Sequence, residues 1–384
     1  MESQQQEKKR AKRGGGGGEA VAAAVKAAAR LLRNSTCVLI AAGAGMSLDS
    51  GLPDYRCKEQ WEQAFPELAS RKLRYEDMAQ AKHFEESPRV VWAWYKHRHD
   101  AYRDAQPHPG YHIVKQWCDQ AVHGARVFTS NVDGFFQRTG FPRSSVVECH
   151  GSLTKLQCCA HDHGVWKSDA TFLKLDNVSL RTHTIAADSV PKCRAFGCGH
   201  AARPNILLFN DSKWTSRASA QQRKAFDAWL QGLPDDSVLA IVEVGAGTTI
   251  PTVRLEVERV VADRIGRGQQ THVIRINPEE GAGGMGVRGK EERREEEQGR
   301  QEEKGQGREE GEREQGGEQE GGEKEGGEQE GGEERETEAR EKDKRQKQEV
   351  DEDDERWRLR QWPGEHVLVR ARALEALTRI HALL

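Results

Sequence analysis

The chain has 384 residues, 35% of them hydrophobic, and a formal net charge of −3. It contains no apolar run near the ~18 to 20 residues of a membrane span, and its N-terminus lacks the apolar stretch of a secretory signal. We therefore expect a soluble, intracellular protein, cytoplasmic or nuclear. In such a chain the eight cysteines are expected to be free thiols and metal ligands rather than disulfides.

The small net charge hides two regions of opposite sign. Residues 287–355 contain 29 acidic and 15 basic side chains, a net of −14, so the rest of the chain carries +11. A moderately basic globular part suits a dinucleotide with two phosphates, but the sequence shows no nucleic-acid footprint. No membrane partner is indicated either.

The first 18 residues are predicted to be a disordered tail. The basic run Lys8 to Arg13 is a candidate nuclear import signal, and the five glycines from Gly14 to Gly18 predict a flexible joint. From Glu19 to Arg33 the alanine-rich, apolar spacing predicts a helix. Residues 19–280 then form the predicted main domain.

A glycine-rich motif follows the first apolar run, Cys37 to Ile40. It reads Ala-Ala-Gly-Ala-Gly-Met-Ser from Ala41 and continues through Leu-Pro-Asp-Tyr-Arg to Arg56. Glycines after a buried strand let the backbone approach a phosphate, whose charge the exposed amides of Gly43 and Gly45 would bind. Two glycines at a strand end also occur for steric reasons alone. Asp54 and Arg56 add a charge pair around an aromatic residue.

Short β-type runs alternate with helical segments along the rest of the domain. The runs are Val127 to Thr129, Asn205 to Phe209, Val238 to Val244 and His272 to Ile276. This alternation predicts an α/β fold with a doubly wound, Rossmann-like parallel sheet, whose ligand lies at the carboxyl ends of the strands. A helical module is inserted at 58–104, and its aromatic stripe, including Trp92, Trp94 and Tyr95, is expected to be core.

Two further motifs give the pattern its specificity. Thr129-Ser-Asn-Val-Asp133 follows one β-type run, and Glu148-Cys-His-Gly151 follows another. Together with the glycine motif, they resemble the sirtuins, NAD-dependent protein deacylases whose motifs read GAG(I/M)S, SG(I/L)PD(F/Y)R, TQN(I/V)D and a His-Gly pair. The resemblance, to a bacterial-like subgroup with a low-complexity insertion, covers residues 19–280 and the last two dozen residues.

The resemblance implies a reaction and assigns roles in it. The acyl oxygen of a modified lysine attacks the nicotinamide ribose of NAD, nicotinamide leaves, and a general base then deprotonates a ribose hydroxyl. His150 matches that base, since the ordinary pKa of histidine lies near neutrality. Asn131 and Asp133 match the pair that orients the nicotinamide carboxamide and ribose. Cys149 is expected to be core, because neighbours on an extended segment point to opposite sides.

The expected NAD contacts are spread over the strand ends. They comprise Gly43, Ala44, Gly45, Ser47, Asp54, Tyr55, Arg56, Ser130, Asn131, Asp133, Gly245, Ala246, Gly247, Thr248, Asn277 and Glu279. The chain departs from the family pattern at Ser130, where the family has Gln, and at Phe136, where a polar residue is frequent. Ala246 and Gly247 replace two hydroxyl residues of a phosphate-side loop. The acyl-lysine tunnel motif Phe-Gly-Glu appears as Phe209-Asn-Asp211.

A small zinc ribbon is predicted at 156–204. The family holds zinc with two cysteine pairs before an Arg-Pro motif, here Arg203-Pro204, and Cys158, Cys193 and Cys198 fit that register. The fourth position falls on His161, with Cys159 and His163 as competitors. Zinc accepts thiolate and imidazole together, so a structural Cys3His site is expected.

Residues 281–355 contain a repeated Gly-Gly-Glu-x-Glu unit without apolar side chains, which predicts disorder. Residues 356–384 return to globular composition, with Val367 to Val369 as a strand and Ala371 to Leu384 as a helix. The acidic segment is therefore predicted to be an insertion that leaves and re-enters the fold near the adenosine end of the NAD site.

The sequence favours an enzyme of the acyltransferase class, an NAD-dependent protein lysine deacylase or deacetylase with acylated protein substrates. An ADP-ribosyltransferase or NAD glycohydrolase would use the same cleavage of nicotinamide with another acceptor. An NAD-binding regulator with little turnover is the third hypothesis, based on Ser130 and Phe136, and His150 argues against it.

Overall fold

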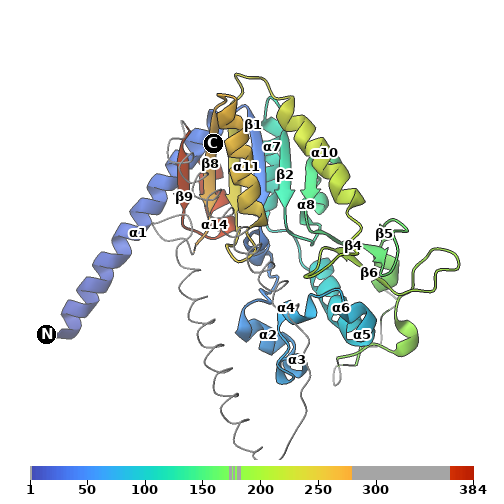
Figure 1. The fold of residues 1–384 in the computed structure, drawn as a ribbon. Helices are drawn as coiled ribbons and strands as arrows, with labels where there is room; N and C mark the ends of the chain where they lie inside the picture. The colour runs from blue at the N-terminus through green and yellow to red at the C-terminus, as the bar shows by residue number, and fades with distance from the viewer. Residues whose placement is uncertain (1, 173–174, 176–177, 180–182, 279–363) are drawn as a thin grey trace, which may run out of the picture. The chain divides into compact units, whose positions relative to one another are not determined.

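Six parallel strands form the main sheet, in the order β3-β2-β1-β7-β8-β9 (Figure 1). The computed structural model describes residues 2–172, 175, 178–179, 183–278 and 364–384. The strands are β1 (Cys37–Ala42), β2 (Ala125–Thr129), β3 (Val146–Glu148), β7 (Leu239–Val244), β8 (Thr271–Ile276) and β9 (His366–Val369).

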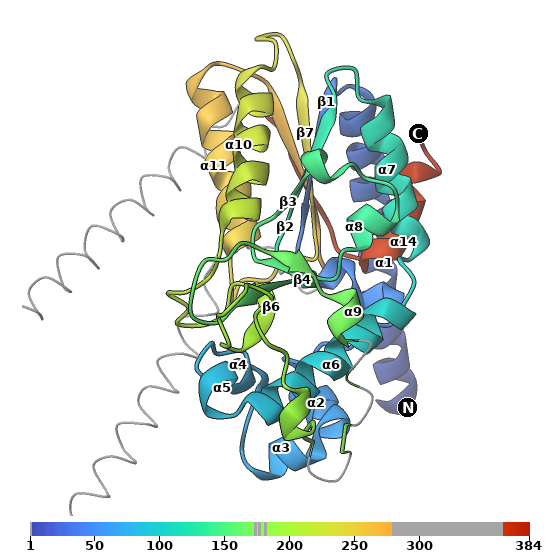
Figure 2. The same ribbon diagram turned by 90° about the vertical axis from the view of Figure 1, so that its right-hand side faces the viewer.

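The central strands β1 and β7 are buried on both faces because helices cover both sides of the sheet, and all their side chains are apolar except that of Glu243, which pairs with Arg275 of β8. Every residue of β1 is buried, and so is every residue of β7. Figure 2 shows α7 (Pro109–Gln120), α14 (Ala373–His381) and α1 (Glu2–Arg33) on one face, and α10 (Arg217–Gln231) and α11 (Thr252–Gly266) on the other.

The chain builds the sheet outwards in both directions from its centre. It runs from β1 through β2 to β3 on one side and from β7 through β8 to β9 on the other. Strand order therefore reverses between β1 and β7, and ligands of doubly wound sheets bind at the carboxyl ends beside such a point. The predicted α/β class is confirmed.

A second, three-stranded antiparallel sheet has the order β5-β4-β6. It consists of β4 (Gly151–Cys158), β5 (Trp166–Lys167) and β6 (Ala202–Ile206). The β-type run Asn205 to Phe209 was expected in the parallel sheet. That expectation is wrong, because the strand begins at Ala202 and pairs with β4 instead.

The inserted helical module packs beside the small sheet. Its helices are α2 (Lys58–Ala64), α3 (Pro66–Ser70), α4 (Tyr75–Met78), α5 (His83–Glu86) and α6 (Pro88–Asp104). Trp92, Trp94 and Tyr95 of α6 are fully buried, as the aromatic stripe predicted. They belong to a core shared with Leu153 and Leu156 of β4, separate from the core around the parallel sheet.

Short helices complete the described residues. They are the 3-10 helices η1 (Ala44–Met46), η2 (Leu48–Ser50), η3 (Arg143–Ser145) and η4 (Ala187–Ser189), and the helical turns α8 (Phe135–Arg138) and α9 (Asp169–Phe172). None of the helices in the described part of the chain has the length and apolar character that a membrane crossing requires.

The ends of the chain differ from the sequence predictions in two places. Helix α1 continues through Gly14 to Gly18, where a flexible joint was predicted. Each glycine makes a helix about 1 kcal/mol less stable than alanine would, but it can still donate the backbone hydrogen bond of the helix. Strand β9 lies parallel to β8, with His366 opposite Val273. The chain therefore leaves the sheet at the carboxyl end of β8 and re-enters it at the amino end of β9. The prediction that it leaves and re-enters at the same end of the sheet is wrong. The predicted insertion itself, 281–355, lies outside the described residues.

Candidate active site

A cavity of about 350 Å³ lies where β1, β2 and β3 end and the helical module begins. Its walls come from both hydrophobic cores. The lining residues that carry functional groups are Ser47, Asp54, Tyr55, Arg56, Tyr75, Tyr95, Arg98, Tyr102, Ser130, Asn131, Asp133, His150 and Thr252. The three sequence motifs thus meet around one hollow, as the switch in strand order predicted.

The glycines of the first motif pack against the loop after β7. A Cβ atom on Gly43 would lie 2.5 Å from the Gly245 carbonyl oxygen, and one on Gly245 would lie 2.4 Å from Gly45. The Gly43 and Gly45 amides donate to the carbonyl oxygens of Val244 and Gly245, 2.9 and 3.0 Å away. These two amides therefore join the loops in this structure, and the contact of Gly43 and Gly45 with NAD stays a prediction. Their glycines make the close approach of two strand ends possible.

Ser47 is the centre of a buried hydrogen-bond network with Asn131 and Asp133. Its hydroxyl donates to Asp133 Oδ2 at 2.7 Å and accepts from Asn131 Nδ2 at 3.0 Å. Asn131 Nδ2 also donates to the Gly43 carbonyl, at 3.0 Å. Burial raises the pKa of Asp133, while hydrogen bonds from the Phe135 amide and Ser47 act against that rise. The network fixes both residues of the second motif against the first.

Tyr111 of α7 completes this network. Its hydroxyl lies 3.0 Å from Ser47 Oγ. Because the serine proton goes to Asp133 and the Asn131 amide group is a donor, Tyr111 must donate to the remaining lone pair of Ser47. The ring is fully buried and packs 5.0 Å from Phe136. Phe136 is thus a core residue and does not line the cavity, so its departure from the family pattern removes no polar group from the site.

His150 faces the same cavity from the end of β3. Its Nε2 lies 3.2 Å from the hydroxyl of Thr252, the first residue of α11. Burial, followed by the positive charge of Arg56, lowers the pKa of His150 below its ordinary value. The imidazole is therefore uncharged near neutral pH and can accept a proton.

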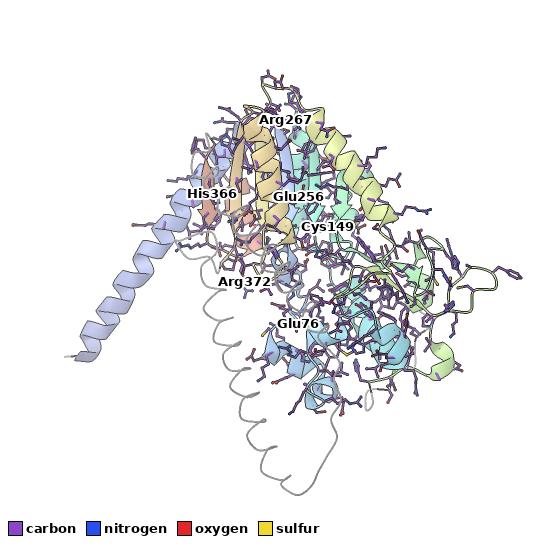
Figure 3. All side chains as sticks on the ribbon, in the orientation of Figure 1. Glu76, Cys149, Glu256, Arg267, His366 and Arg372 are labelled. Carbon is purple, nitrogen blue, oxygen red and sulfur yellow. The ribbon has the colours of Figure 1, made fainter. Side chains whose placement is uncertain are left out.

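Cys149 does not form a pair with His150. Burial, helped by the charge of Glu256, raises the pKa of the Cys149 thiol to about 12, so the thiolate is scarce at neutral pH. Figure 3 labels Cys149 and Glu256 near the carboxyl end of the sheet, with Arg267 towards the opposite end. Cys149 is partly buried and is not among the residues lining the cavity. Cys149 was expected to be core and is only partly buried, but its high pKa agrees with the expectation that it forms no nucleophile–base pair with His150.

The loop 245–248 is held in place through one carbonyl. The Ala246 oxygen accepts from Arg254 Nη2 at 2.8 Å and from Asn277 Nδ2 at 3.2 Å. Both donors lie at the carboxyl edge of the sheet, beside the switch point. Neither Ala246 nor Asn277 lines the 350 Å³ cavity, which reaches this side of the sheet only at Ile250 and Thr252. Glu279 lies outside the described residues.

Arg98 of α6 is the unexpected residue of the cavity. Its side chain is buried, and no carboxylate of the described residues lies within ion-pair distance of it. One guanidinium nitrogen donates to Tyr102 at 2.9 Å, whereas Nε has no hydrogen-bond partner in the described structure. The guanidinium instead lies against aromatic rings, 5.1 Å from Trp94 and 5.5 Å from Tyr95 and Tyr102.

Part of the cavity lining is apolar. Leu48, Leu207 and Phe209 remain more than a third exposed there. Asp211 of the Phe209-Asn-Asp211 motif forms a buried, two-pronged ion pair with Arg203, at 2.7 and 2.8 Å. The aspartate thus anchors the turn, and Phe209 is the member of the motif that reaches the cavity.

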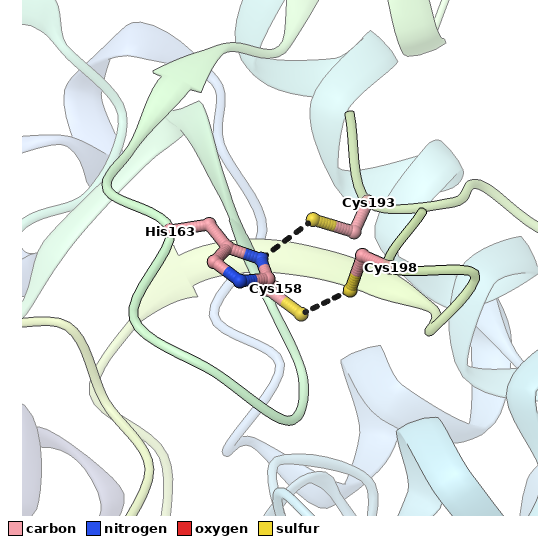
Figure 4. Close-up of side chains that lie close together, drawn as sticks. All are labelled: Cys158, His163, Cys193 and Cys198. Carbon is pink, nitrogen blue, oxygen red and sulfur yellow. Dashed lines mark hydrogen bonds between the residues drawn. The ribbon is translucent and has the colours of Figure 1, made fainter. Parts of the chain in front are cut away.

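Four metal-type ligands gather between β4 and β6. The ligand atoms of Cys158, His163, Cys193 and Cys198 all lie within 4.8 Å of one another (Figure 4). His163 Nδ1 is 3.3 Å from Cys193 Sγ, and Cys158 Sγ is 3.7 Å from Cys198 Sγ. Three sulfurs and one imidazole nitrogen form a donor set that suits tetrahedral zinc.

His163, rather than the predicted His161, accompanies the three cysteines. The His161 ring faces His163 and His200, at 5.4 and 5.1 Å between centroids. Cys159 is buried on the other side, where burial raises the pKa of its thiol to about 12. The chain bends at residues 159–161 after β4, and this path brings His163, and neither Cys159 nor His161, to Cys158.

The sequence thus predicted most of the cavity but not five of its functional lining residues, Tyr75, Tyr95, Arg98, Tyr102 and Thr252, nor Tyr111, which contacts Ser47 behind the lining. Ser47, Asp54, Tyr55, Arg56, Ser130, Asn131, Asp133 and His150 all line it. Arg98 could have been suspected as a charged residue within the buried stripe of α6, one turn after Tyr95. Tyr111 and Thr252 carry no local signal, because each comes to the site through tertiary packing.

Comparison with known proteins decides the family. The family model described as the Sir2 family matches residues 43–228. The chain belongs to the Sir2 family. This range of the sirtuin contains all three motifs of the cavity and the four metal-type ligands.

Relatives of this sirtuin occur in bacteria, archaea and mammals. It is 26% identical over 244 residues to an NAD-dependent protein deacylase of Aquifex aeolicus, a match over 63% of this chain and 84% of the relative. It is 31% identical over 182 residues to NAD-dependent protein deacylase 2 of Pyrobaculum aerophilum, over 47% and 61% of the two chains. It is 28% identical over 186 residues to the mitochondrial NAD-dependent protein deacylase sirtuin-5 of Canis lupus familiaris, a match over 46% of this chain and 56% of the relative.

Among solved structures, a Sir2 homologue in complex with NAD aligns with 66% of this sirtuin and 82% of its own chain. The sequence identity is 21% and the TM-score 0.46.

Proposed function

We propose that this sirtuin is an NAD-dependent protein lysine deacylase, which transfers the acyl group to ADP-ribose and releases nicotinamide. One observation carries the proposal: His150, an uncharged base, faces the same cavity as the fixed network of Ser47, Asn131 and Asp133. The relatives named as NAD-dependent protein deacylases support it. Bound NAD supplies the electrophilic ribose carbon and the leaving nicotinamide.

The protein groups divide the work between orientation and proton transfer. Asn131 and Asp133, held by Ser47, orient the nicotinamide end of NAD through matched donors and acceptors. His150 takes the proton of a ribose hydroxyl at Nε2, the nitrogen that contacts Thr252. Leu48, Leu207 and Phe209 exclude water around the aliphatic part of the acyl-lysine. The loop 245–248, Asn277 and Glu279 remain proposed contacts of the diphosphate and the adenosine.

The cavity further favours an acyl group that carries its own carboxylate. Arg98 is a buried guanidinium with a free Nε donor and no carboxylate partner among the described residues. A buried charge is costly unless it is paired, and guanidinium binds carboxylates through two parallel hydrogen bonds. A dicarboxylic acyl group on lysine would supply the missing anion. An acetyl group would leave Arg98 unpaired.

Steady-state kinetics with two peptides test this preference. For the native chain, kcat/KM for a succinyl-lysine peptide is expected to exceed that for the acetyl-lysine peptide of the same sequence. Since a hydrogen bond to a charged group contributes about 1.5–3 kcal/mol, Arg98→Met should lower succinyl turnover by roughly 10- to 100-fold. Acetyl turnover should change little. Equal losses for both peptides would exclude a role of Arg98 in acyl recognition.

The cysteine and histidine cluster fits a structural role for zinc. It lies in the loops of the small sheet, and none of its four ligands lines the active-site cavity. We expect the bound metal to hold these loops together and take no part in the reaction. The basic run Lys8 to Arg13 supports a nuclear or cytoplasmic location, which imaging of the intact chain and of a Lys8-to-Arg13 alanine variant would test.

A further inference from the structure

A second cavity, of about 610 Å³, lies beside the active site and is lined mainly by cations. We call it the cationic groove. Arg138, Arg143, Lys155, Lys167 and Arg194 line it, together with a single carboxylate, that of Glu148. Charged groups of one sign that share a concave surface repel one another and concentrate ions of the opposite sign.

Most of this positive charge is not neutralised within the described structure. Glu148 lies 3.4 Å from Lys155 and offsets that one cation. Arg138 donates to the carbonyl oxygens of Tyr102 and Ala105, which hold its position but carry no net charge. The side chains of Arg143, Lys167 and Arg194 make no hydrogen bond or ion pair with a described residue, and the Arg194 guanidinium lies over the Trp166 ring, 5.3 Å from its centroid.

The register of the small sheet points independently to an anion. Lys155 of β4 lies directly opposite Lys167 of β5 in this antiparallel pair. Like charges in directly opposed positions destabilise a strand pair. Glu148 forms an ion pair with Lys155 but not with Lys167 in the described structure. A further carboxylate bound between the two ammonium groups would therefore remove their repulsion.

The groove begins where the active-site cavity ends. Gly134 and Glu148 line the groove, while Asp133 and His150 line the active site, so each pair is one or two residues apart in the chain. A residue of extended chain spans about 3.3 Å. A protein that places a lysine in the active site therefore has flanking residues within reach of the groove.

The chemistry of the groove suits carboxylate side chains of a polypeptide. Arg194 already covers the Trp166 ring, so no open aromatic face is offered to a nucleobase. We propose that the cationic groove binds an acidic segment of the acylated protein substrate. This inference rests on the proposed deacylase function and adds a sequence preference to it.

The test compares two acyl-lysine peptides of equal length on the full chain. In one peptide the residues flanking the lysine are glutamates, and in the other they are glutamines. At low ionic strength the native chain should have a KM at least ten-fold lower for the glutamate peptide. The difference should shrink at high salt, since exposed charges are screened over about 10 Å at 0.1 M.

Charge reversal in the groove should abolish this preference. Arg143→Glu with Lys167→Glu should raise the KM of the glutamate peptide about ten-fold and leave the glutamine peptide and the KM of NAD unchanged. The same double variant should favour a lysine-flanked peptide. Lys26→Glu, an exposed position on α1, is the matched control and should leave all three values unchanged.

A direct binding measurement separates failure of this proposal from failure of the proposed function. A fluorescently labelled glutamate peptide without acyl-lysine should bind the native chain, measured by anisotropy, and should bind the double variant at least ten-fold more weakly. Equal KM values for the two peptides, or equal binding by the native chain and the double variant, would show that the cationic groove does not bind an acidic substrate segment. If neither acyl peptide turned over, the proposed deacylase function would be wrong. The binding assay would still show whether the cationic groove binds the acidic peptide.

Discussion

The Ser47, Asn131, Asp133 and Tyr111 network explains how four residues from three separate segments act together. Ser47 can donate one proton and accept two, and the structure uses all three positions. Such a fully satisfied buried network restricts the side chains to one arrangement, whereas a partly satisfied network loses that restriction. The geometry of the nicotinamide end therefore depends on Tyr111 of α7, although Tyr111 does not line the cavity.

Tyr111→Phe tests this dependence at the smallest scale. The variant keeps the ring but removes the donor to Ser47, at a cost of about 1–3 kcal/mol for an unpaired buried acceptor. We expect kcat/KM for NAD to fall by roughly ten-fold, with the KM of the acyl peptide unchanged. An unaltered kcat/KM together with a lowered melting temperature would confine Tyr111 to a structural role.

The lowered pKa of His150 predicts the acid limb of the pH profile. His150 must be uncharged to act as a base, so activity is lost when pH falls through its pKa. Burial and Arg56 lower that pKa, which places the midpoint of the acid limb of kcat/KM below the ordinary value of about 6.5. Arg56→Gln should move the midpoint upward. A midpoint that stays in place would show that another group controls the limb.

At the scale of elements, the sequence predicted the parallel sheet and its ligand edge because the central strands are short, largely apolar runs that alternate with helical segments. It did not predict the partner of the segment around Asn205, since pairing with β4 is a long-range contact. It also could not place His163 ahead of His161. Two histidines two residues apart are equivalent in sequence, and the path of the loop after β4 selects between them.

Metal analysis of single variants tests the cluster. The native chain should contain about one zinc, and Cys198→Ser or His163→Ala should lower the metal content and the melting temperature, because structural zinc contributes folding free energy. His161→Ala and Cys159→Ser are the matched controls and should keep the metal. Loss of zinc in His161→Ala with retention in His163→Ala would contradict the structure.

At the scale of the whole molecule, the acidic segment joins two strands of the main sheet. The described chain ends at Pro278, after β8, and resumes at Gly364, before β9. Closing a longer loop costs only about 0.6 kcal/mol per doubling of its length, so a long connection here is compatible with the fold. The composition of residues 281–355 predicted an insertion. The sequence pattern of the last strand could not show whether it runs parallel or antiparallel to β8, and so could not show at which edge of the sheet the chain re-enters.

Replacing Ala282 to Glu355 with a short Gly/Ser linker should preserve folding and basal activity. The replaced segment carries a net charge of −14 and leaves the sheet at its carboxyl edge, where NAD is proposed to bind. Its removal should therefore lower the KM of NAD at low ionic strength, with a smaller difference at high salt. An unfolded variant would show that the segment is structural, and an unchanged KM would exclude this electrostatic effect.

The most direct test of the account is the stoichiometry of the products. The chain is incubated with NAD and an acyl-lysine peptide, and nicotinamide, deacylated peptide and O-acyl-ADP-ribose are measured by mass spectrometry. Deacylation coupled to NAD cleavage should give equal amounts of the three products. All three should be lost in His150→Ala, which should still bind NAD. Nicotinamide release with the acyl peptide intact, accompanied by free ADP-ribose or ADP-ribosylated protein, would contradict it.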